Sequence, residues 1–283
     1  MSVVARRGAK FPLPLRQVQS RRRAAAVETH VPELVKSSSV LRPQRLLEQA
    51  HMDAARPQLP VGLGMDSAAV RRQMVQRLLL AGLDHQAVLD AMAAVPRHQF
   101  VDAALAAQAY EDTSLPIGHG QTISKPSVVG RMIALLFEGA NAMHNGHLGR
   151  VLEVGTGCGY QAALLARLGR FVISIERIKP LHDRARTLMG AQGADGLRLV
   201  YGDGTLGHPP NAPYDSIIAA AGGDSMPAAW PQQLGIGGRL VVPMRQPGDD
   251  RQVLVVVDRT EHGFRQTLHE AVNFVPLKSG LVG

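Results

Sequence analysis

Three glycines stand at alternate positions, 155, 157 and 159, in the segment VLEVGTGCGY. An apolar, β-rich run precedes them and the helix-like run YQAALLARLG follows, so the glycines occupy a strand-to-helix turn. In an open parallel sheet, ligands bind beside the carboxyl end of a strand at such a turn. Glycine suits this place because the backbone can turn tightly and approach a ligand without a Cβ in the way.

The spacing of these glycines separates two kinds of ligand. A dinucleotide fingerprint, GxGxxG, requires its third glycine at position 160, where this chain has Tyr160. The observed GxGxG instead resembles the first motif of the Rossmann-like methyltransferases, which bind S-adenosylmethionine. The remaining alternative is a tight turn that binds nothing. Cys158 is interpreted as a small loop residue rather than a nucleophile, because no histidine lies near it in sequence.

Two acidic residues end the next two predicted strands. Glu176 ends FVISIE, about 20 positions beyond the glycine loop, where a carboxylate can accept hydrogen bonds from ribose hydroxyls. Asp203 and Gly204 follow LRLVY, within YGDGTLG. Alone, an Asp-Gly pair indicates a turn. At this strand end, we expect it to reach the exocyclic amine of an adenine.

The framework that positions these residues is an alternation of strands and helices from residue 150 onward. VLEV, FVISIE, LRLVY, YDSIIAAA and GRLVVPM alternate with YQAALLARLG, PLHDRARTLMGAQG and SMPAAWPQQLG. This pattern predicts an α/β fold of the Rossmann-like methyltransferase type, with a mostly parallel twisted sheet and helices on both faces. The final segment predicts an antiparallel closing hairpin that turns at Glu261-His262-Gly263.

Residues 66–149 predict helices around one irregular segment. DSAAVRRQMVQRLLLAG has helical spacing, with Gly82 as its C-cap, and DHQAVLDAMAAV predicts a second helix that Pro96 stops. RHQFVDAALAAQAYED predicts a third short helix. LPIGHGQTIS, which is typical of neither helix nor strand, then precedes a further helix with Pro126 near its start.

Charge is distributed unevenly along the 283 residues. Residues 1–65 hold 11 Lys and Arg against 4 Asp and Glu, which is +7 of the net +8, whereas residues 66–283 hold 20 against 19. A nucleic-acid partner would require a basic face on the folded part, and we expect none. The longest apolar runs are too short for a membrane span, so no membrane partner is expected either.

The irregular segment LPIGHGQTIS resembles the substrate loop of the protein-L-isoaspartate (D-aspartate) O-methyltransferases. AVPRHQFV before it, VLEVGTGCGYQAALLA, ISIERI, GDG, APYDSII and the terminal FVPL are similar to motifs of the same family and occur in the expected order. The match covers roughly residues 70–278. It implies methyl transfer from S-adenosylmethionine to the free carboxylate of L-isoaspartyl and D-aspartyl residues in damaged proteins and peptides, which initiates their repair.

The resemblance also implies roles for single residues. Ser124 matches the active-site serine, and Thr122 is placed beside it as a second catalytic hydroxyl. The cofactor site gains Glu153, Thr156 and Arg177, which lie within the same motifs. The implied substrate-binding residues are Ile117, Gly118, His119, Gly120, Val275, Pro276 and Leu277. No metal is expected.

The chemistry explains these residue types. A carboxylate with a reference pKa of about 3.9 is already ionised at neutral pH, so it needs alignment with the methyl group rather than a strong base. Backbone N–H groups of the GHG turn are suited to cradle it, and the hydroxyls of Thr122 and Ser124 to orient it. Two alternatives stay open: Ser124 caps the helix that follows, and FVPL is an ordinary terminal strand.

Two features depart from the family pattern. The segment AAAGGDSMP at 219–227 replaces the proline-containing turn that relatives tend to carry after the fourth strand, and residues 1–65 precede the usual start. The rival functions are an S-adenosylmethionine-dependent methyltransferase for small molecules or RNA, and a binding protein that has kept only the fold. Against the first, AAAGGDSMP lacks the Asn/Asp-Pro-Pro-Tyr/Phe signature of amine methylation. Against the second, the glycine loop, Glu176, Asp203 and Ser124 are intact.

The expected organisation is therefore an extension followed by one domain. Prolines, serines and charges recur without a period in residues 1–65, which predicts disorder. An organellar transit peptide is the alternative for this Arg-rich, acid-poor stretch. Residues 66–283 form a single methyltransferase domain, made of N-terminal helices with the substrate loop (66–149) and a cofactor-binding α/β core (150–283). We expect a cytoplasmic monomer.

Deletion of residues 1–65 tests this boundary. The melting temperature and the methylation of a short isoaspartyl peptide should stay within error of the full chain, because the deleted segment lacks an apolar pattern that could join the core. Differential scanning calorimetry and a methyl-transfer assay measure the two quantities. A truncated chain that does not fold would place the domain boundary further upstream.

Overall fold

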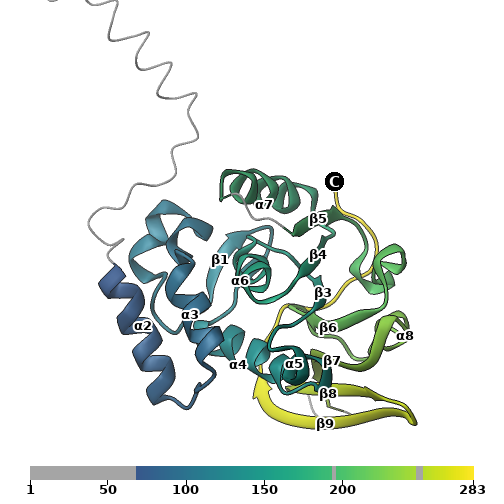
Figure 1. The fold of residues 1–283 in the computed structure, drawn as a ribbon. Helices are drawn as coiled ribbons and strands as arrows, with labels where there is room; N and C mark the ends of the chain where they lie inside the picture. Colours follow the sequence, from purple (N-terminus) through teal and green to yellow (C-terminus); the bar gives the residue numbers. More distant parts are fainter. Residues whose placement is uncertain (1–67, 193–195, 247–250) are drawn as a thin grey trace, which may run out of the picture. The chain divides into compact units, whose positions relative to one another are not determined.

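A seven-stranded sheet forms the centre of the chain in the computed structural model, which describes residues 68–192, 196–246 and 251–283 (Figure 1). Its strand order is β5-β4-β3-β6-β7-β8-β9. The strands are β3 (Arg150–Val154), β4 (Phe171–Glu176), β5 (Leu197–Tyr201), β6 (Tyr214–Ala219), β7 (Leu234–Arg245), β8 (Gln252–Thr260) and β9 (Gly263–Val272). The extension predicted for residues 1–65 lies outside the described residues.

The sheet is parallel from β5 to β7 and antiparallel at β8 and β9. The parallel pairs require crossovers, which helices supply: α6 (Tyr160–Leu168), α7 (Lys179–Gln192) and α8 (Ala229–Gln233). The strands β3, β4 and β6 are almost wholly buried, as expected for a sheet covered on both faces. The predicted α/β fold is confirmed, and so is the closing hairpin, in which Thr260 pairs with Gly263.

Helices α2 (Ala68–Leu80) and α3 (Gln86–Ala94) precede the sheet. Gly82, with φ of +97°, follows α2 in the left-handed region, and the Leu83 N–H donates to the Leu78 carbonyl (3.0 Å). This is the glycine-terminated helix end that the sequence predicts. The helix predicted within RHQFVDAALAAQAYED is wrong in type, because the segment forms two 3₁₀ turns, η3 (Arg97–Phe100) and η4 (Ala103–Gln108). Asp102 separates them and caps η4, with its carboxylate accepting from the Ala104 N–H (2.9 Å).

The irregular segment LPIGHGQTIS is a β-hairpin, which its sequence did not predict. Strand β1 (Leu115–Gly118) pairs antiparallel with β2 (Gln121–Ile123). Gly118, His119 and Gly120 all have positive φ, at +92°, +54° and +68°. Glycine reaches this region without strain, and the two glycines flanking His119 allow a sharp reversal in so short a hairpin.

Helix α4 (Pro126–Phe137) follows the hairpin, and helix α5 (Ala140–Asn145) follows α4. The N-cap residue of α4 is Lys125, and its side chain makes no capping hydrogen bond. The alternative in which Ser124 is the N-cap is therefore wrong. Asp112 satisfies the helix start instead: its two carboxylate oxygens accept from the Ser127 N–H (2.8 Å) and hydroxyl (2.7 Å). The end of the hairpin is thus fixed by a residue that precedes it in sequence, and the Ser124 hydroxyl is not used for capping.

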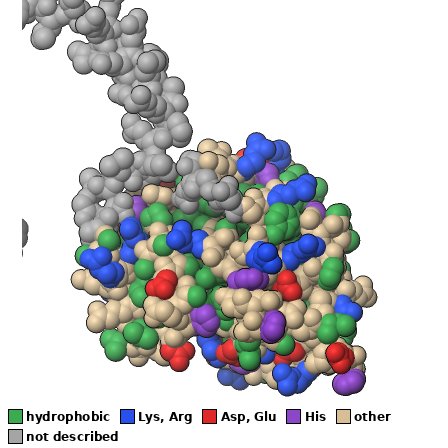
Figure 2. Space-filling view, in the orientation of Figure 1, with side chains coloured by type: hydrophobic (Ala, Val, Ile, Leu, Met, Phe, Trp, Pro, Cys, Tyr) green, Lys and Arg blue, Asp and Glu red, His purple; other side chains and the backbone are tan. Residues whose placement is uncertain are grey.

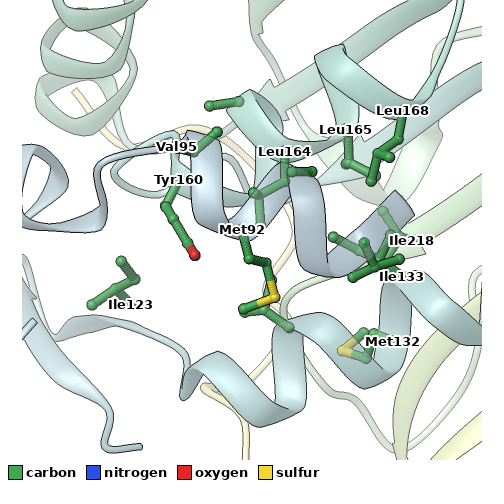
Figure 3. Packing of buried hydrophobic residues seen from close by; sticks show 14 of the residues in the cluster. Met92, Val95, Ile123, Met132, Ile133, Tyr160, Leu164, Leu165, Leu168 and Ile218 are labelled. Carbon is green, nitrogen blue, oxygen red and sulfur yellow. The ribbon is translucent and has the colours of Figure 1, made fainter. Parts of the chain in front are cut away.

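The apolar interior joins the N-terminal helices to one face of the sheet. Figure 3 shows Met92 of α3, Met132 and Ile133 of α4, and Leu164 of α6 within one buried cluster. A second cluster lies on the other face of the sheet, around Trp230. None of the helices in the described ranges is long and apolar enough to cross a membrane. On the face shown in Figure 2, Lys and Arg side chains are interspersed with Asp and Glu.

Candidate functional site

A cleft lies at the carboxyl ends of β3 and β4, where the sequence places a ligand. Its wall combines the glycine loop with the end of the hairpin and the C-terminal segment. Of the predicted site residues, those that line it are Ile117, Thr122, Ser124, Gly155, Thr156, Gly157, Glu176, Arg177, Gly204, Val275, Pro276 and Leu277. The structure therefore brings together residues separated by as many as 160 positions.

The glycine loop adopts the backbone conformation that favours glycine. Gly155, Gly157 and Gly159 have φ of +92°, +55° and +93°. A Cβ built on Gly157 would lie 3.2 Å from Ile117 Cδ1, which is closer than ordinary van der Waals contact. The loop and the hairpin therefore meet at Gly157, and a Cβ there would require the Ile117 side chain to shift by a few tenths of an ångström. Gly159 begins α6 and does not line the cleft.

Glu176 holds the glycine loop from the end of β4. Its Oε2 accepts from the Gly157 N–H (2.8 Å), and its Oε1 accepts from the Ile178 N–H (2.9 Å). The side chain is nearly buried, yet it forms part of the cleft wall. Each carboxylate oxygen can accept a second hydrogen bond. The residue is therefore placed to join the loop to a ligand hydroxyl.

Glu153 lies beneath the loop and outside the cleft wall, fully buried. The Ser174 hydroxyl donates to its Oε2, and Ser174 Oγ lies 2.6 Å from Thr156 Oγ1. Burial raises the pKa of Glu153, hydrogen bonding with Ser174 and Gln161 lowers it, the nearby Glu176 raises it slightly, and the net pKa is about 8. Glu153 therefore supports the loop through Ser174 and Thr156 rather than forming the cleft wall.

Asp203 also lies outside the cleft wall, although its neighbour Gly204 lines it. The Asp203 carboxylate accepts from Thr205 N–H (2.9 Å) and hydroxyl (2.7 Å), and from Gly280 N–H (2.6 Å). Desolvation raises the pKa of Asp203, but these hydrogen bonds outweigh it, so the net shift is downward. In this arrangement Asp203 fastens the C-terminal segment to the end of β5; its expected contact with adenine stays a prediction.

The C-terminal segment crosses back to the strands that carry Glu176 and Asp203, so that the chain ends beside β5 (Figure 1). The Arg177 guanidinium donates to the carbonyls of Gly280 (2.8 Å) and Ser279 (3.0 Å). The backbone of Val282 bonds to those of Arg177 and Lys179 on either side. Arg177 thus lines the cleft and also holds the C-terminal segment by hydrogen bonds.

The hairpin contributes its second strand rather than its tip. Gly118, His119 and Gly120 lie outside the cleft wall, whereas Gln121 lines it together with Ile123. The backbone N–H groups of this tip were predicted to hold the substrate carboxylate. The tip lies outside the cleft wall, so its position does not support that role, which stays a prediction. The sequence reasoning missed Gln121, Tyr160, Gln161 and Lys278. Tyr160 and Gln161 directly follow the glycine loop, and that position alone was the signal that could have found them.

Residues 275–277 form the wall opposite the loop, and the unusual segment after β6 holds them there. The Gly222 N–H donates to the Val275 carbonyl (2.9 Å), and the Leu277 N–H donates to the Gly222 carbonyl (2.7 Å). FVPL is therefore not an ordinary strand, since it makes a single bridge with this segment. The AAAGGDSMP departure consequently shapes the cleft directly, and its Ala220 and Ala221 line it.

A mostly parallel sheet with a GxGxG loop after β3 and an acidic residue at the end of β4 defines a Rossmann-like, S-adenosylmethionine-dependent methyltransferase. Solved structures agree with this class. A protein-L-isoaspartate O-methyltransferase superposes with a TM-score of 0.66 at 26% identity, covering 75% of this chain and 67% of that one. A Plasmodium falciparum protein, in complex with S-adenosyl-L-homocysteine, superposes with a TM-score of 0.63 at 22% identity over 74% of this chain and 98% of its own, which shows the shared fold.

The family model for protein-L-isoaspartate(D-aspartate) O-methyltransferase matches residues 69–281, and the chain belongs to this family. It is 55% identical to the protein-L-isoaspartate O-methyltransferase of Methylibium petroleiphilum over 99% of both chains. It is 54% identical to that of Leptothrix cholodnii, over 97% of this chain and 95% of the other. The resemblance seen in the sequence is confirmed. Because these two alignments cover nearly the whole chain, the N-terminal extension is shared with relatives.

The burial of Glu153 predicts a pH-dependent stability. Its pKa is about 8 in the folded chain against an ordinary value of 4.5. Between these values the folded state binds more protons than the unfolded state, so the free energy of unfolding falls as pH rises, by at most about 1.4 kcal/mol per pH unit. Glu153→Gln is neutral at every pH, so it should gain stability relative to wild type between pH 4.5 and 8.

Urea unfolding across this pH range measures the difference between the two chains. Glu261→Gln, in the exposed turn before β9, is the control and should follow the wild-type pH dependence. If the free energy of unfolding changed with pH in the same way for wild type and Glu153→Gln, Glu153 would be ionised in the folded state throughout the range.

Proposed function

We propose that this protein transfers a methyl group from S-adenosylmethionine to the free carboxylate of L-isoaspartyl and D-aspartyl residues in proteins and peptides. The observation that carries the proposal is the meeting of two ligand sites in one cleft. The glycine loop and the hairpin that bears Ser124 touch at Gly157 and Ile117. A donor held by the loop and an acceptor held by the hairpin are therefore close enough to react.

The residues at the loop fit S-adenosylmethionine. Gly155 and Gly157 expose backbone without side chains, and the Glu176 carboxylate faces the cleft with acceptor capacity for ribose hydroxyls. Gly204 lines the cleft at the end of β5, on the side proposed for the adenine, and packs closely against Val154, so that a Cβ there would lie 2.5 Å from it. When bound, S-adenosylmethionine supplies a methyl group on a positively charged sulfur, which a carboxylate oxygen can attack directly.

The residues at the hairpin fit a carboxylate acceptor. Thr122 and Ser124 line the cleft and can donate hydroxyl hydrogen bonds that orient the anion. Val275, Pro276 and Leu277 offer an apolar wall for the peptide beside it. The acceptor is already an anion, so these side chains align it and no proton needs to be removed first. The resulting ester closes to a succinimide, which reopens in part to a normal aspartyl bond.

The partners proposed are isoaspartyl-containing proteins and peptides, acted on by a monomer in the cytoplasm. A methyltransferase for RNA amines is the alternative on the same fold. It is disfavoured because the segment after β6 is AAAGGDSMP, whose Gly222 is engaged with Val275 and Leu277. Of that segment, Ala220 and Ala221 line the cleft, and neither side chain can hold a nucleobase amine; Asp224 pairs with Arg245 instead.

Incubation with methyl-labelled S-adenosylmethionine tests the proposed function. An isoaspartyl peptide should become labelled as a base-labile ester, and its normal aspartyl twin should not, because only the first presents its α-carboxylate on a displaced backbone. Labelling of both peptides, or labelling of RNA and neither peptide, would contradict the proposal.

Replacement of Ser124 tests the acceptor site. Ser124→Ala should lower kcat on the isoaspartyl peptide by about 10- to 100-fold, since it removes one aligning hydrogen bond. Affinity for S-adenosylmethionine should stay near wild type, because Ser124 faces the acceptor. The pH–rate profile should keep its shape, since Ser124 is not a general base. Ser114→Ala, at an exposed position directly before β1, is the matched control for the loss of a serine hydroxyl nearby and should keep the wild-type kcat. Full activity of Ser124→Ala, or a new steep pH dependence, would remove Ser124 from this role.

A further inference from the structure

Among the described residues two arginines are buried, Arg97 and Arg239, and they differ in what surrounds their charge. Arg239 of β7 is 8% exposed and ion-paired, with its Nε 2.6 Å from Asp258 Oδ1 and its Nη1 3.1 Å from Glu138 Oε2. Arg97 of η3 is fully buried, and no acidic side chain in the described ranges lies within ion-pair distance of it. A buried charge without a counter-charge costs free energy, so the place of Arg97 requires an explanation.

Arg97 donates to three neutral backbone carbonyls, while burial lowers its pKa and the side chains of Tyr160 and Asp112 raise it. Its Nε donates to Ala109 (2.8 Å), and its Nη2 donates to Ser124 (2.7 Å) and, at 3.5 Å, to Thr113. Within the part of the chain that the structure describes, its Nη1 has no hydrogen-bond partner. The guanidinium is thus hydrogen-bonded to the Ser124 carbonyl at the end of the hairpin, and one of its nitrogens, Nη1, carries two further N–H donors.

The ring of Tyr160 covers the other side of this charge. The Arg97 guanidinium carbon lies 4.8 Å from the Tyr160 ring centroid, an attractive cation–π distance. Tyr160 belongs to the cleft wall, and Figure 3 shows it between Ile123 of β2 and Met92 of α3. Burial lowers the pKa of Arg97, and the contacts with Tyr160 oppose that shift. Arg97 therefore sits one layer behind the cleft, separated from it by Ser124 and Tyr160.

We propose that Arg97 is a positioning residue for the acceptor, whose buried charge selects a carboxylate at Ser124 and whose Nη2 fixes the hairpin end that carries the Ser124 hydroxyl. The inference rests on the proposed function. The carboxylate is fully charged when it binds and loses that charge as it becomes an ester. Arg97's charge therefore contributes to binding of the acceptor, whereas its hold on Ser124 contributes to alignment during transfer.

The test pairs a change of charge in the protein with a change of charge in the ligand. Calorimetry, in the presence of S-adenosyl-L-homocysteine, compares an isoaspartyl peptide with its α-carboxamide analogue. Wild type should bind the carboxylate peptide more tightly than the carboxamide. In Arg97→Gln the ratio of the two affinities should fall about tenfold, which is the effect of one charge-assisted interaction. Arg97→Lys should keep the preference within about threefold, because it keeps the charge. A folded Arg97→Gln with the wild-type preference overturns the proposal.

Kinetics separate positioning from a purely structural role. Arg97→Lys should lower kcat by about tenfold, because an ammonium cannot reproduce the fork that holds Ser124. Arg239→Lys is the matched control: it should lower the melting temperature and leave both the preference and kcat unchanged. If Arg97→Gln does not fold, Arg97→Lys alone tests the proposal. An unchanged kcat in Arg97→Lys, or the loss of its preference for the carboxylate peptide, would contradict the proposal. Failure of wild type to methylate the isoaspartyl peptide would instead reject the proposed function.

Discussion

The close approach of Gly157 to Ile117 is the constraint on which the site depends. A glycine lets the loop after β3 lie against the hairpin without displacing a side chain, whereas a Cβ would lie 3.2 Å from Ile117 Cδ1, which would have to move by a few tenths of an ångström. The positive φ of Gly157 and its N–H bond to Glu176 fix the loop in that position. Because of this contact, the glycine loop and the hairpin line the same cleft. A methyl group can therefore pass directly between two molecules bound there.

Charge is arranged on two sides of that contact. Glu176 lies under the loop, on the side proposed for the cofactor, and Arg97 lies behind Ser124, on the side proposed for the anionic acceptor. Nearby opposite charges favour the charged form of a ligand, so this separation suits a cationic donor and an anionic acceptor. Hydrogen bonds of Gly222 with Val275 and Leu277, and of Gly280 with the Asp203 carboxylate, hold the C-terminal segment whose residues 275–278 line the cleft.

Much of this arrangement could be predicted from local patterns, and the rest depends on distant contacts. The strands and the glycine loop follow from runs of β-branched residues and from glycine spacing, which are local signals. The β-hairpin at 115–123 was missed because its turn depends on three successive positive φ values, and Ser124 was given a possible capping role that Asp112 fulfils from outside. Lys278 was missed because only the folded chain brings the C-terminal segment to the cleft, whereas Tyr160 had one local signal, its place directly after the glycine loop.

Substitution of Gly157 tests the single-cleft account most directly. Gly157→Ala should weaken S-adenosylmethionine binding and also raise the KM for the isoaspartyl peptide, because its Cβ presses on the hairpin. Gly155→Ala is the matched control, since it has the same sign of φ but would place its Cβ 3.5 Å from Ala220, away from the hairpin. It should weaken only cofactor binding. Equal peptide KM values for the two variants, in folded protein, would contradict the claim that loop and hairpin form one site.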